Sequence, residues 1–424
     1  MREMKDSGID WINNTPATWE IKRIKAVLVE RNESNNPVKT DFILSLTNDR
    51  GVIPYADKGE IGNKSKADLS GYKLAYPNDI VLNSMNVFIG SVALSSYYGC
   101  VSPVYYMLYT RYKKDNIKYY NYLFQTQELQ KKLHGYGNGI MDIRMRIQMS
   151  KLNTVMIPIP PSDEQHKIAD YLDKKCSKID AIIEKQQTVI EKLKAYKLSV
   201  ITEVVTKGLN PDTEMKDSEI DWIGIIPVHW SLCKLKYVTE IMRGKFNHRP
   251  RNDPKYYDGK YPFVQTGDVA RASKFIETYS QTLNELGYSV SKEFPKGSIC
   301  MTIAANVGDV AVLNFDACFP DSVVGFVPVE EIHWNYLYYV LSAMKQQFTR
   351  NAIISTQLNL NVEIIKEEFI PIVAYQEQLD IAQYLDNKCS AIENSILRKK
   401  DIIEKLTAYK KSLIFEVVTG KKEV

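Results

Sequence analysis

Basic side chains gathered in one short stretch offer the clearest chemistry in the sequence. Between Lys234 and Lys260 stand eight lysines and arginines against three acidic residues. Glycines and prolines interrupt the stretch, which indicates a loop. Cations on a loop can contact phosphates, and Arg and Asn can reach base edges. The candidate nucleic-acid contacts here are Arg243, Lys245, His248, Arg249, Arg251, Lys255, Tyr256 and Tyr257. A solvated basic loop is the alternative interpretation.

A second and weaker set of candidates lies in the first third of the chain. The words NDRGVIPYADKGEIGNKSK, residues 48–66, and GYGNGIMDIRMR, residues 135–146, combine cations with tyrosines. The candidate contacts in these words are Arg50, Lys58, Lys64, Lys66, Tyr136, Arg144 and Arg146. Structural ion pairs made by Arg144 and Arg146 remain an equal alternative.

The overall charge does not by itself indicate a polyanion partner. The chain of 424 residues has a net charge of +4. Residues 1–160 have a net charge of +6 and residues 209–374 a net charge of −4. Contact with nucleic acid must therefore rest on local patches.

Catalytic and metal-binding motifs are missing from the sequence. It contains neither a GxxxxGK[ST] phosphate loop nor an HExxH zinc motif. Its six cysteines, at positions 100, 176, 233, 300, 318 and 389, form no CxxC pair, which predicts buried free thiols and no metal site. The word DPKY, residues 253–256, lacks the second proline of the D-P-P-Y loop of amino-methyltransferases and is interpreted as a turn. We therefore expect no catalytic residues.

Two stretches of the sequence occur twice, and these repeats define how the rest of the chain is divided. Residues 158–206 align without a gap with residues 371–419, and 27 of the 49 positions are identical. Upstream, residues 4–19 match residues 215–230. The segments between these words hardly align. The repeated stretches, which we call the frame, thus enclose two different segments, which we call the filling segments. Such internal repetition indicates duplicated structural units.

Each long repeat predicts one long helix. Pro158, Pro160 and Pro161 exclude a helix before Ser162, and no Pro or Gly follows until Gly208. About 44 helical residues would span roughly 65 Å. The second copy predicts a helix from about residue 375 to residue 419.

Apolar residues follow a three-and-four spacing along both predicted helices, which is typical of a helix-helix seam. The seam residues are Ile179, Ile183, Ile190, Leu193, Val200 and Val204 in the first copy and Ile392, Ile396, Ile403, Leu406, Leu413 and Val417 in the second. Gln186, Lys197, Lys399 and Lys410 fill gaps in this pattern and could fix the register. We expect an antiparallel coiled coil with a pseudo-two-fold axis. The last four seam residues of the first copy are expected to face those of the second, and two unrelated core helices are the alternative.

The filling segments combine strand and helix patterns. Strands are predicted where apolar residues alternate with polar ones or form continuous runs, in residues 79–94, 102–110, 260–270 and 297–313. Helices are predicted where apolar residues have helical spacing, in residues 119–137 and 334–350. The predicted fold class is mixed α+β. The predicted domains are 1–157 and 209–370, with spacer helices in 158–208 and 371–424.

Several words together resemble the specificity (S) subunit of type I restriction–modification enzymes. They are GCVSPVYY at 99–106, IPIPPSDEQHKIADYLD at 157–173, GIIPVHW at 224–230 and YPFVQTGDV at 261–269, and the likeness covers essentially the whole chain. The resemblance implies two target-recognition domains that each read one half of a bipartite double-stranded DNA site. It also implies that the paired helices set the half-site spacing.

The resemblance further implies partners. Two methyltransferase (M) subunits would dock on the chain and bind S-adenosylmethionine, and restriction (R) subunits would bring ATP and Mg²⁺ chemistry. The chain itself would be a non-catalytic DNA-specificity subunit. We expect it to be cytoplasmic, because the charged N-terminus MREMKDSGIDW lacks the apolar core of a signal peptide. Two alternatives remain, namely a coiled-coil scaffold for protein partners and a fused methyltransferase that would bind S-adenosylmethionine itself.

Overall fold

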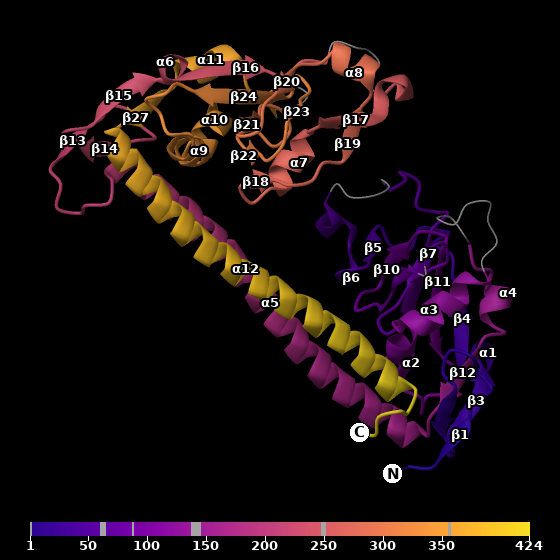
Figure 1. Ribbon diagram of the computed structural model, residues 1–424. Helices are drawn as coiled ribbons and strands as arrows, with labels where there is room; N and C mark the ends of the chain where they lie inside the picture. Colours follow the sequence, from indigo (N-terminus) through magenta and orange to yellow (C-terminus); the bar gives the residue numbers. More distant parts are fainter. Residues whose placement is uncertain (1, 60–64, 87–88, 137–145, 247–251, 355–357) are drawn as a thin grey trace. The chain divides into compact units, whose positions relative to one another are not determined.

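The computed structural model describes residues 2–59, 65–86, 89–136, 146–246, 252–354 and 358–424 (Figure 1). The chain divides into two compact units. Unit 1 contains Met1–Lys185 and Asp401–Val424, and unit 2 contains Gln186–Lys400. Each unit therefore combines one filling segment with part of both long helices, α5 (Ser162–Lys207) and α12 (Tyr375–Val418).

Unit 1 is built on small antiparallel sheets. Its main sheet has the order β4-β11-β8-β9, and the pairs β1-β2, β3-β12, β5-β6 and β7-β10 surround it. The strands are β1 (Met4–Asp6), β2 (Asn14–Pro16), β3 (Glu20–Arg23), β4 (Leu28–Arg31), β5 (Leu44–Thr47), β6 (Gly51–Pro54), β7 (Lys73–Ala75), β8 (Ile80–Asn83), β9 (Val92–Leu94), β10 (Gly99–Val101), β11 (Tyr105–Thr110) and β12 (Met156–Ile159). The short helices are α1 (Ile24–Val27), α2 (Ile117–Phe124), α3 (Gln127–His134) and α4 (Met149–Leu152), with a 3₁₀ turn at Tyr55–Lys58.

Unit 2 repeats this plan and enlarges it. Its main sheet has the order β16-β24-β21-β22-β18, beside a second sheet β19-β17-β23-β20 and the pairs β13-β14, β15-β27 and β25-β26. The strands are β13 (Met215–Asp217), β14 (Ile225–Pro227), β15 (Ser231–Lys234), β16 (Thr239–Arg243), β17 (Tyr257–Phe263), β18 (Phe275–Ile276), β19 (Gln281–Leu283), β20 (Glu293–Phe294), β21 (Ile299–Thr302), β22 (Val310–Leu313), β23 (Ala317–Cys318), β24 (Val323–Pro328), β25 (Ile353–Ile354), β26 (Leu358–Asn359) and β27 (Phe369–Ile372). The helices are α6 (Leu235–Val238), α7 (Thr266–Arg271), α8 (Glu285–Ser289), α9 (Trp334–Ala343), α10 (Lys345–Asn351) and α11 (Val362–Glu367), with a 3₁₀ turn at Pro254–Tyr256.

Successive side chains along the central strands point to opposite faces of each main sheet, and both faces are buried. In β21, Ile299 and Met301 pack into the core that also holds α9, whereas Cys300 between them packs on the other side of the sheet. In β8, Ile80 and Leu82 join the core with α2, and Val81 packs against β5 and β6. A period of two residues places these neighbours on opposite faces.

The two long helices run antiparallel within each unit, as expected. In unit 1, Cys176 and Ile179 near the start of α5 share a core with Leu413 and Val417 near the end of α12. In unit 2, Val200 and Val204 share a core with Ile381, Leu385 and Cys389 at the start of α12. The expectation that Val200 and Val204 face Leu413 and Val417 was therefore wrong, because antiparallel packing reverses the order of contacts.

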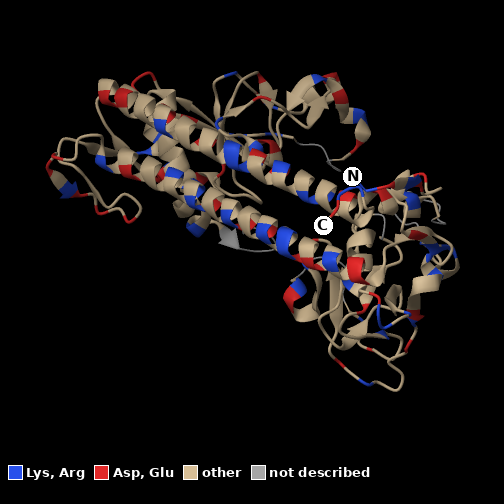
Figure 2. Ribbon diagram, turned by 90° about the horizontal axis from the view of Figure 1, so that it is seen from below, with Lys and Arg blue, Asp and Glu red and all other residues tan. Residues whose placement is uncertain are grey.

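The seam residues are covered to different degrees. Ile183, Leu193, Ile403 and Leu406 are half-buried. The buried members are Ile179, Ile190, Val200, Val204, Ile392, Ile396, Leu413 and Val417. Acidic and basic residues are interspersed along both helices (Figure 2).

Polar residues in the gaps of the seam pair across the two helices. Lys399 Nζ donates to Gln186 Oε1 at 3.2 Å. Lys410 pairs with Asp180 at 2.7 Å in unit 1, and Lys197 pairs with Glu393 at 2.6 Å in unit 2. The residue numbers of each ion pair add to 590, so both units have the same register. Polar partners at seam positions favour one register over its alternatives.

The repeated residues at the start of each long helix make the same contacts twice. The buried indole of Trp19 donates to Glu164 at 2.9 Å, and that of Trp230 donates to Glu377 at 3.1 Å. The amide oxygens of the next residues, Gln165 and Gln378, each accept a backbone N–H from the segment before α2 or α9, at 2.9 and 2.8 Å. A buried indole N–H and a buried amide need such partners. We call these contacts of the tryptophan, glutamate and glutamine at the start of each long helix the joint of that unit. The frame is therefore repeated because each unit needs its own joint.

The glycine after each long helix completes the joint. Gly208 and Gly420 have φ angles of 76° and 74°, a conformation that glycine adopts without strain. A Cβ atom on Gly420 would lie 2.4 Å from the ring of Pro16, and one on Gly208 would lie 3.2 Å from the indole of Trp230. The end of α12 thus packs against Pro16 in unit 1, and the end of α5 packs against Trp230 in unit 2.

Two local predictions were wrong. Residues 266–270 were expected to continue a strand, but they form α7, because Gln265 and Asp268 open a helical turn there. The stretch from Arg243 to Lys260 was expected to be a loop, but Arg243 ends β16 and Tyr257–Phe263 form β17. Among the helices of the described residues, none is long and apolar enough to cross a membrane.

Candidate nucleic-acid interface

The described candidates of unit 2 lie at the ends of β16 and β17. Arg243 is exposed, and its Nε donates to the carbonyl of Asp321 at 2.6 Å. Lys245 is exposed one residue beyond Gly244. Lys255 is exposed and lies 3.1 Å from Asp253, whose carboxylate raises the pKa of the Lys255 ammonium. The other candidates, His248, Arg249 and Arg251, lie outside the described residues.

The two tyrosines of this stretch belong to an aromatic cluster. Tyr256 is only 8% exposed and packs edge-on against Phe246. Tyr257 is half-buried and tilts against Phe246 and Phe263. Most of the Tyr256 ring is thus unavailable to a nucleic acid, because it packs against the segment next to β17.

The candidates of unit 1 are more scattered. Arg50 is exposed, donates to the carbonyl of Asp57 at 2.9 Å and lies 3.8 Å from the Asp49 carboxylate. Lys58 stands 5.2 Å above the ring of Tyr55. Lys66 and Arg146 are exposed, and Tyr136 packs against the core of the unit. Lys64 and Arg144 lie outside the described residues.

Three polar residues of unit 2 were not among the predicted contacts, and two of them, Gln265 and Gln281, line the same pocket as Tyr257. Arg271 is exposed and pairs with the buried carboxylate of Asp268. Gln265 donates to Gln281 at 2.8 Å. A count of charges detects no amide, so the signal for Gln265 was the word YPFVQTGDV, and Gln281 lies outside that word.

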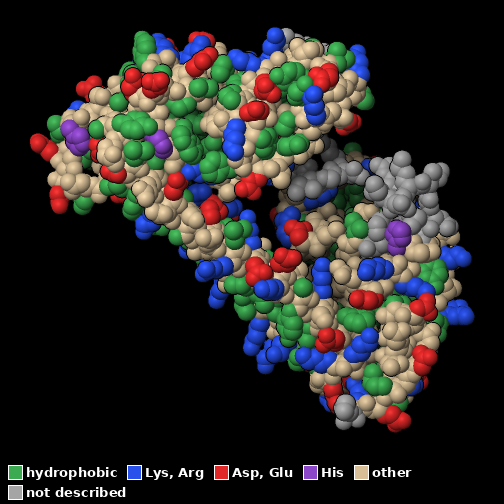
Figure 3. Space-filling model, in the orientation of Figure 1, with side chains coloured by type: hydrophobic (Ala, Val, Ile, Leu, Met, Phe, Trp, Pro, Cys, Tyr) green, Lys and Arg blue, Asp and Glu red, His purple; other side chains and the backbone are tan. Residues whose placement is uncertain are grey.

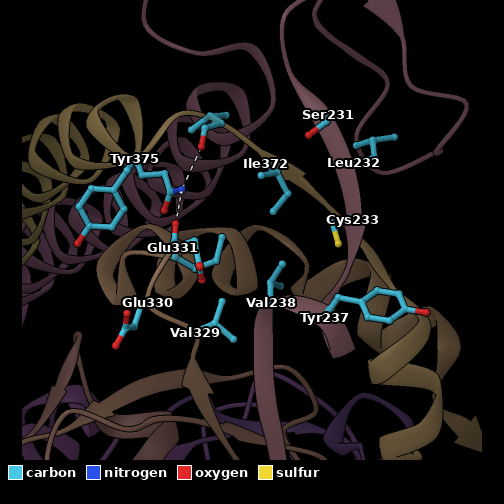
Figure 4. A pocket seen from close by; sticks show the side chains of 13 residues that line it. Ser231, Leu232, Cys233, Tyr237, Val238, Val329, Glu330, Glu331, Ile372 and Tyr375 are labelled. Carbon is cyan, nitrogen blue, oxygen red and sulfur yellow. Dashed lines mark hydrogen bonds between the residues drawn. The ribbon is translucent and has the colours of Figure 1, made fainter.

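One surface groove of unit 2 has a lining that does not favour DNA. It runs between β15, β27 and the start of α12, and its lining includes Tyr237, Val329 and Tyr375 (Figure 4). Hydrophobic side chains gather on this face of the unit (Figure 3). The charged residues that line the groove are Glu330 and Glu331, which would repel phosphates. The basic candidates at the ends of β16 and β17 remain the better interface.

The cysteines are buried or half-buried free thiols, as predicted. Burial raises the pKa of the Cys300 and Cys318 thiols to about 12, so they stay protonated and unreactive at neutral pH. Among the described residues, no group of three or more His, Cys, Asp or Glu side chains could hold a metal ion.

The comparison with known families explains why the frame occurs twice. The type I restriction modification DNA specificity domain matches residues 16–192 and again residues 227–405. The chain belongs to this specificity family. Each match covers most of one filling segment together with most of the long helix that follows it.

Two relatives of the specificity family match nearly the whole chain, and a third matches part of it. The specificity subunits MjaX and MjaVIII of type I restriction enzymes from Methanocaldococcus jannaschii are 27% and 24% identical over 97% and 96% of this chain, and the matches cover 95% and 93% of those proteins. The EcoBI specificity subunit of Escherichia coli is 22% identical over 61% of this chain and 58% of its own length.

A solved structure shares the fold. A chain from a structural study of the assembly and conformational transition of the type I R-M system superposes with a TM-score of 0.72, at 14% sequence identity. The superposition covers 96% of this chain and 99% of that chain. The predicted α+β fold with two paired long helices is therefore confirmed.

Proposed function

We propose that this specificity-family chain selects the DNA sequence for a type I restriction–modification complex, with each unit reading one half of a bipartite site. One observation carries this proposal. Both units repeat the same joint of tryptophan, glutamate and glutamine, but the segments that the joint encloses differ in sequence and strand number. The shared frame would let both units assemble with the same kind of partner, and the different filling segments would let them read two different half-sites.

The outer faces of the helices support a partner that binds twice. Within residues 191–199 and 404–412, five exposed residues are identical in the two copies: Glu191, Lys192, Ala195, Tyr196 and Ser199 in α5, and Glu404, Lys405, Ala408, Tyr409 and Ser412 in α12. We call these residues the docking stripes. Tyr196 and Tyr409 are 52% and 50% exposed. Exposed aromatic residues repeated at both sites suit two copies of one methyltransferase subunit.

The chemistry of the complex would then belong to its partners. S-adenosylmethionine would bind to the methyltransferase subunits, and ATP and Mg²⁺ to the restriction subunits. This chain would bind, position and discriminate DNA without catalysing a step. Base-specific contact in the major groove requires donors and acceptors held at fixed places, and these exposed side chains at strand ends can supply them.

Methylation mapping tests the proposal directly. The full chain is produced together with the methyltransferase subunits of its system in a host that lacks other DNA methylation, and modified bases are mapped across the genome. We expect one bipartite motif with a fixed spacer. If modification shows no such motif, and the complex also enriches none from a random DNA library, the chain is better explained as a scaffold for protein partners.

The basic segment of unit 2 provides a prediction about one half-site. Changing Arg249 and Arg251 to Ala should lower methylation at least tenfold or relax the motif in one half only, because each lost base contact costs about 1–3 kcal/mol. Arg398→Ala in α12 is the control, since it removes an exposed arginine outside the segment. An equal loss of sequence preference in both halves would contradict independent readout by the two units.

The docking stripes provide a prediction about assembly. Tyr196→Ala together with Tyr409→Ala should weaken binding of the methyltransferase subunit by tenfold or more, since buried aromatic anchors dominate interface energies. Analytical ultracentrifugation of the mixed subunits measures this. Tyr237→Ala, which removes an exposed tyrosine outside the stripes, should leave assembly unchanged. Unaltered binding by the double variant would place the partner elsewhere.

A further inference from the structure

We propose that Gln281 of unit 2 reads an adenine through the major groove and that Gln265 positions it for this contact. The inference rests on the proposed function and goes further, since it names a side chain and a base. Gln281 begins β19 and is exposed, and Gln265 lies two residues beyond the end of β17. Phe263 of β17 and Gln281 are register partners, so the two amides meet at the same edge of the sheet.

A hydrogen bond fixes the orientation of the Gln281 amide. Nε2 of Gln265 donates to Oε1 of Gln281 at 2.8 Å. One lone pair of Oε1 and both hydrogens of Nε2 therefore remain for a ligand, and among the described residues Nε2 of Gln281 has no hydrogen-bond partner. An amide that offers one acceptor and one donor side by side matches N6–H and N7 of adenine.

The backbone that carries both glutamines is anchored by a buried carboxylate. Asp268 is 3% exposed, and its Oδ2 accepts from the backbone N–H of Gln265 at 2.8 Å and from Ser280 Oγ at 3.2 Å. Its other oxygen accepts from Arg271. Residues adjoining both glutamines are thus tied to one rigid group. Fixing a side chain before binding lowers the entropy lost on contact.

An apolar hollow next to the amides suits the partner base. Phe246, Tyr257, Phe263 and Pro320 form the apolar part of a small pocket, and Asn252, Gln265 and Gln281 form its polar part. In the major groove, thymine is distinguished by its methyl group, and aromatic or aliphatic surface accepts it. An amide beside an apolar hollow therefore favours an A·T pair over a G·C pair.

Two basic residues lie beside this hollow, where they could contact phosphates of the DNA duplex whose bases the glutamines read. Gly244 packs so closely on Pro320 that a Cβ atom would lie 2.3 Å from its carbonyl oxygen. The exposed Arg243 and Lys245 on either side of Gly244 therefore flank the wall of the hollow. Phosphate contacts of this kind set the depth and register of a protein on DNA, and base contacts then specify sequence.

Unit 1 carries a different residue at the corresponding place. The word LSLTNDR, residues 44–50, aligns with FVQTGDV, residues 263–269, when Asp49 is matched to Asp268, and Leu46 then takes the place of Gln265. Leu46 is buried in a small core of unit 1. The amide pair is therefore a feature of unit 2 alone, and it should act on one half-site.

The experiment compares methylation motifs of variants in the full chain, assembled with its methyltransferase subunits. Gln281→Leu should relax one adenine position in one half of the motif by about tenfold or more, while the other half stays unchanged. Gln281→Glu keeps the acceptor for Gln265 but removes the donor, and it should shift preference at that position from adenine toward cytosine. Gln346→Leu, an exposed glutamine of α10, is the control.

Gln265→Leu tests the positioning residue. It should relax the same single position as Gln281→Leu, whereas a merely structural role would lower methylation at all positions of the motif alike. If the wild-type complex has a bipartite motif and both Gln281 variants leave it unaltered, the amide assignment is overturned while the proposed function stands. If the wild-type complex has no motif, the proposed function itself fails.

Discussion

A shorter spacer in the recognised DNA is the expected result of removing seven residues from each long helix. The deletions are residues 183–189 in α5 and residues 397–403 in α12. Seven helical residues span about 10 Å, which corresponds to about three base pairs at 3.4 Å each. Methylation mapping should therefore find both half-sites unchanged and their separation reduced by about three base pairs.

The deletions are chosen so that the helix pair keeps its contacts. They remove Ile183 and Gln186 from α5 and Lys399 and Ile403 from α12, which is one three-and-four repeat in each helix. The ion pairs Asp180–Lys410 and Lys197–Glu393 and both docking stripes remain. A seven-residue deletion keeps the apolar stripe in phase, whereas a deletion of another length would rotate it away from its partner.

Single deletions serve as controls. Removing the segment from α5 alone or from α12 alone leaves helices of unequal length, so the seam and the joints at Trp19 and Trp230 can no longer form together. We expect loss of methylation in both single variants. A fully active double deletion with the original spacing would contradict the idea that these helices measure the distance between half-sites.

The second large effect is expected from Trp230→Ala. This indole is 1% exposed, and its N–H donates to Glu377 at 3.1 Å. Removing a buried tryptophan should lower the free energy of unfolding of unit 2 by about 3–5 kcal/mol, through lost packing and the cavity left behind. The loss of the Glu377 donor adds to this cost. Urea unfolding of the full chain, followed by circular dichroism, measures the shift.

The duplicated frame supplies a matched comparison. Trp19→Ala removes the equivalent indole from unit 1, where Trp19 is fully buried and donates to Glu164 at 2.9 Å. We expect a similar loss confined to unit 1. Tyr237→Ala removes a ring that is 66% exposed and should change stability by no more than about 0.5 kcal/mol. A Trp230→Ala chain as stable as the Tyr237→Ala chain would show that the joint is unimportant for folding.

The frame of this protein was readable from the sequence because it depends on local and repeated signals. Prolines before Ser162, the uninterrupted helical run and the three-and-four spacing predicted α5 and α12 to within one or two residues. Repetition of the Glu-Gln word indicated that the start of each helix matters. These signals need no knowledge of distant contacts, since helix periodicity and proline geometry act within a few residues.

The details of the interface were decided only by tertiary packing. The sequence pattern placed Tyr256 on an exposed loop, but contacts with Phe246 bury its ring. Gln265 and Gln281 stand 16 residues apart and meet only because β17 pairs with β19. The direction of the helix pairing likewise sets which seam residues touch. Strand register and helix direction depend on contacts between distant residues, and a periodicity within one segment cannot encode them.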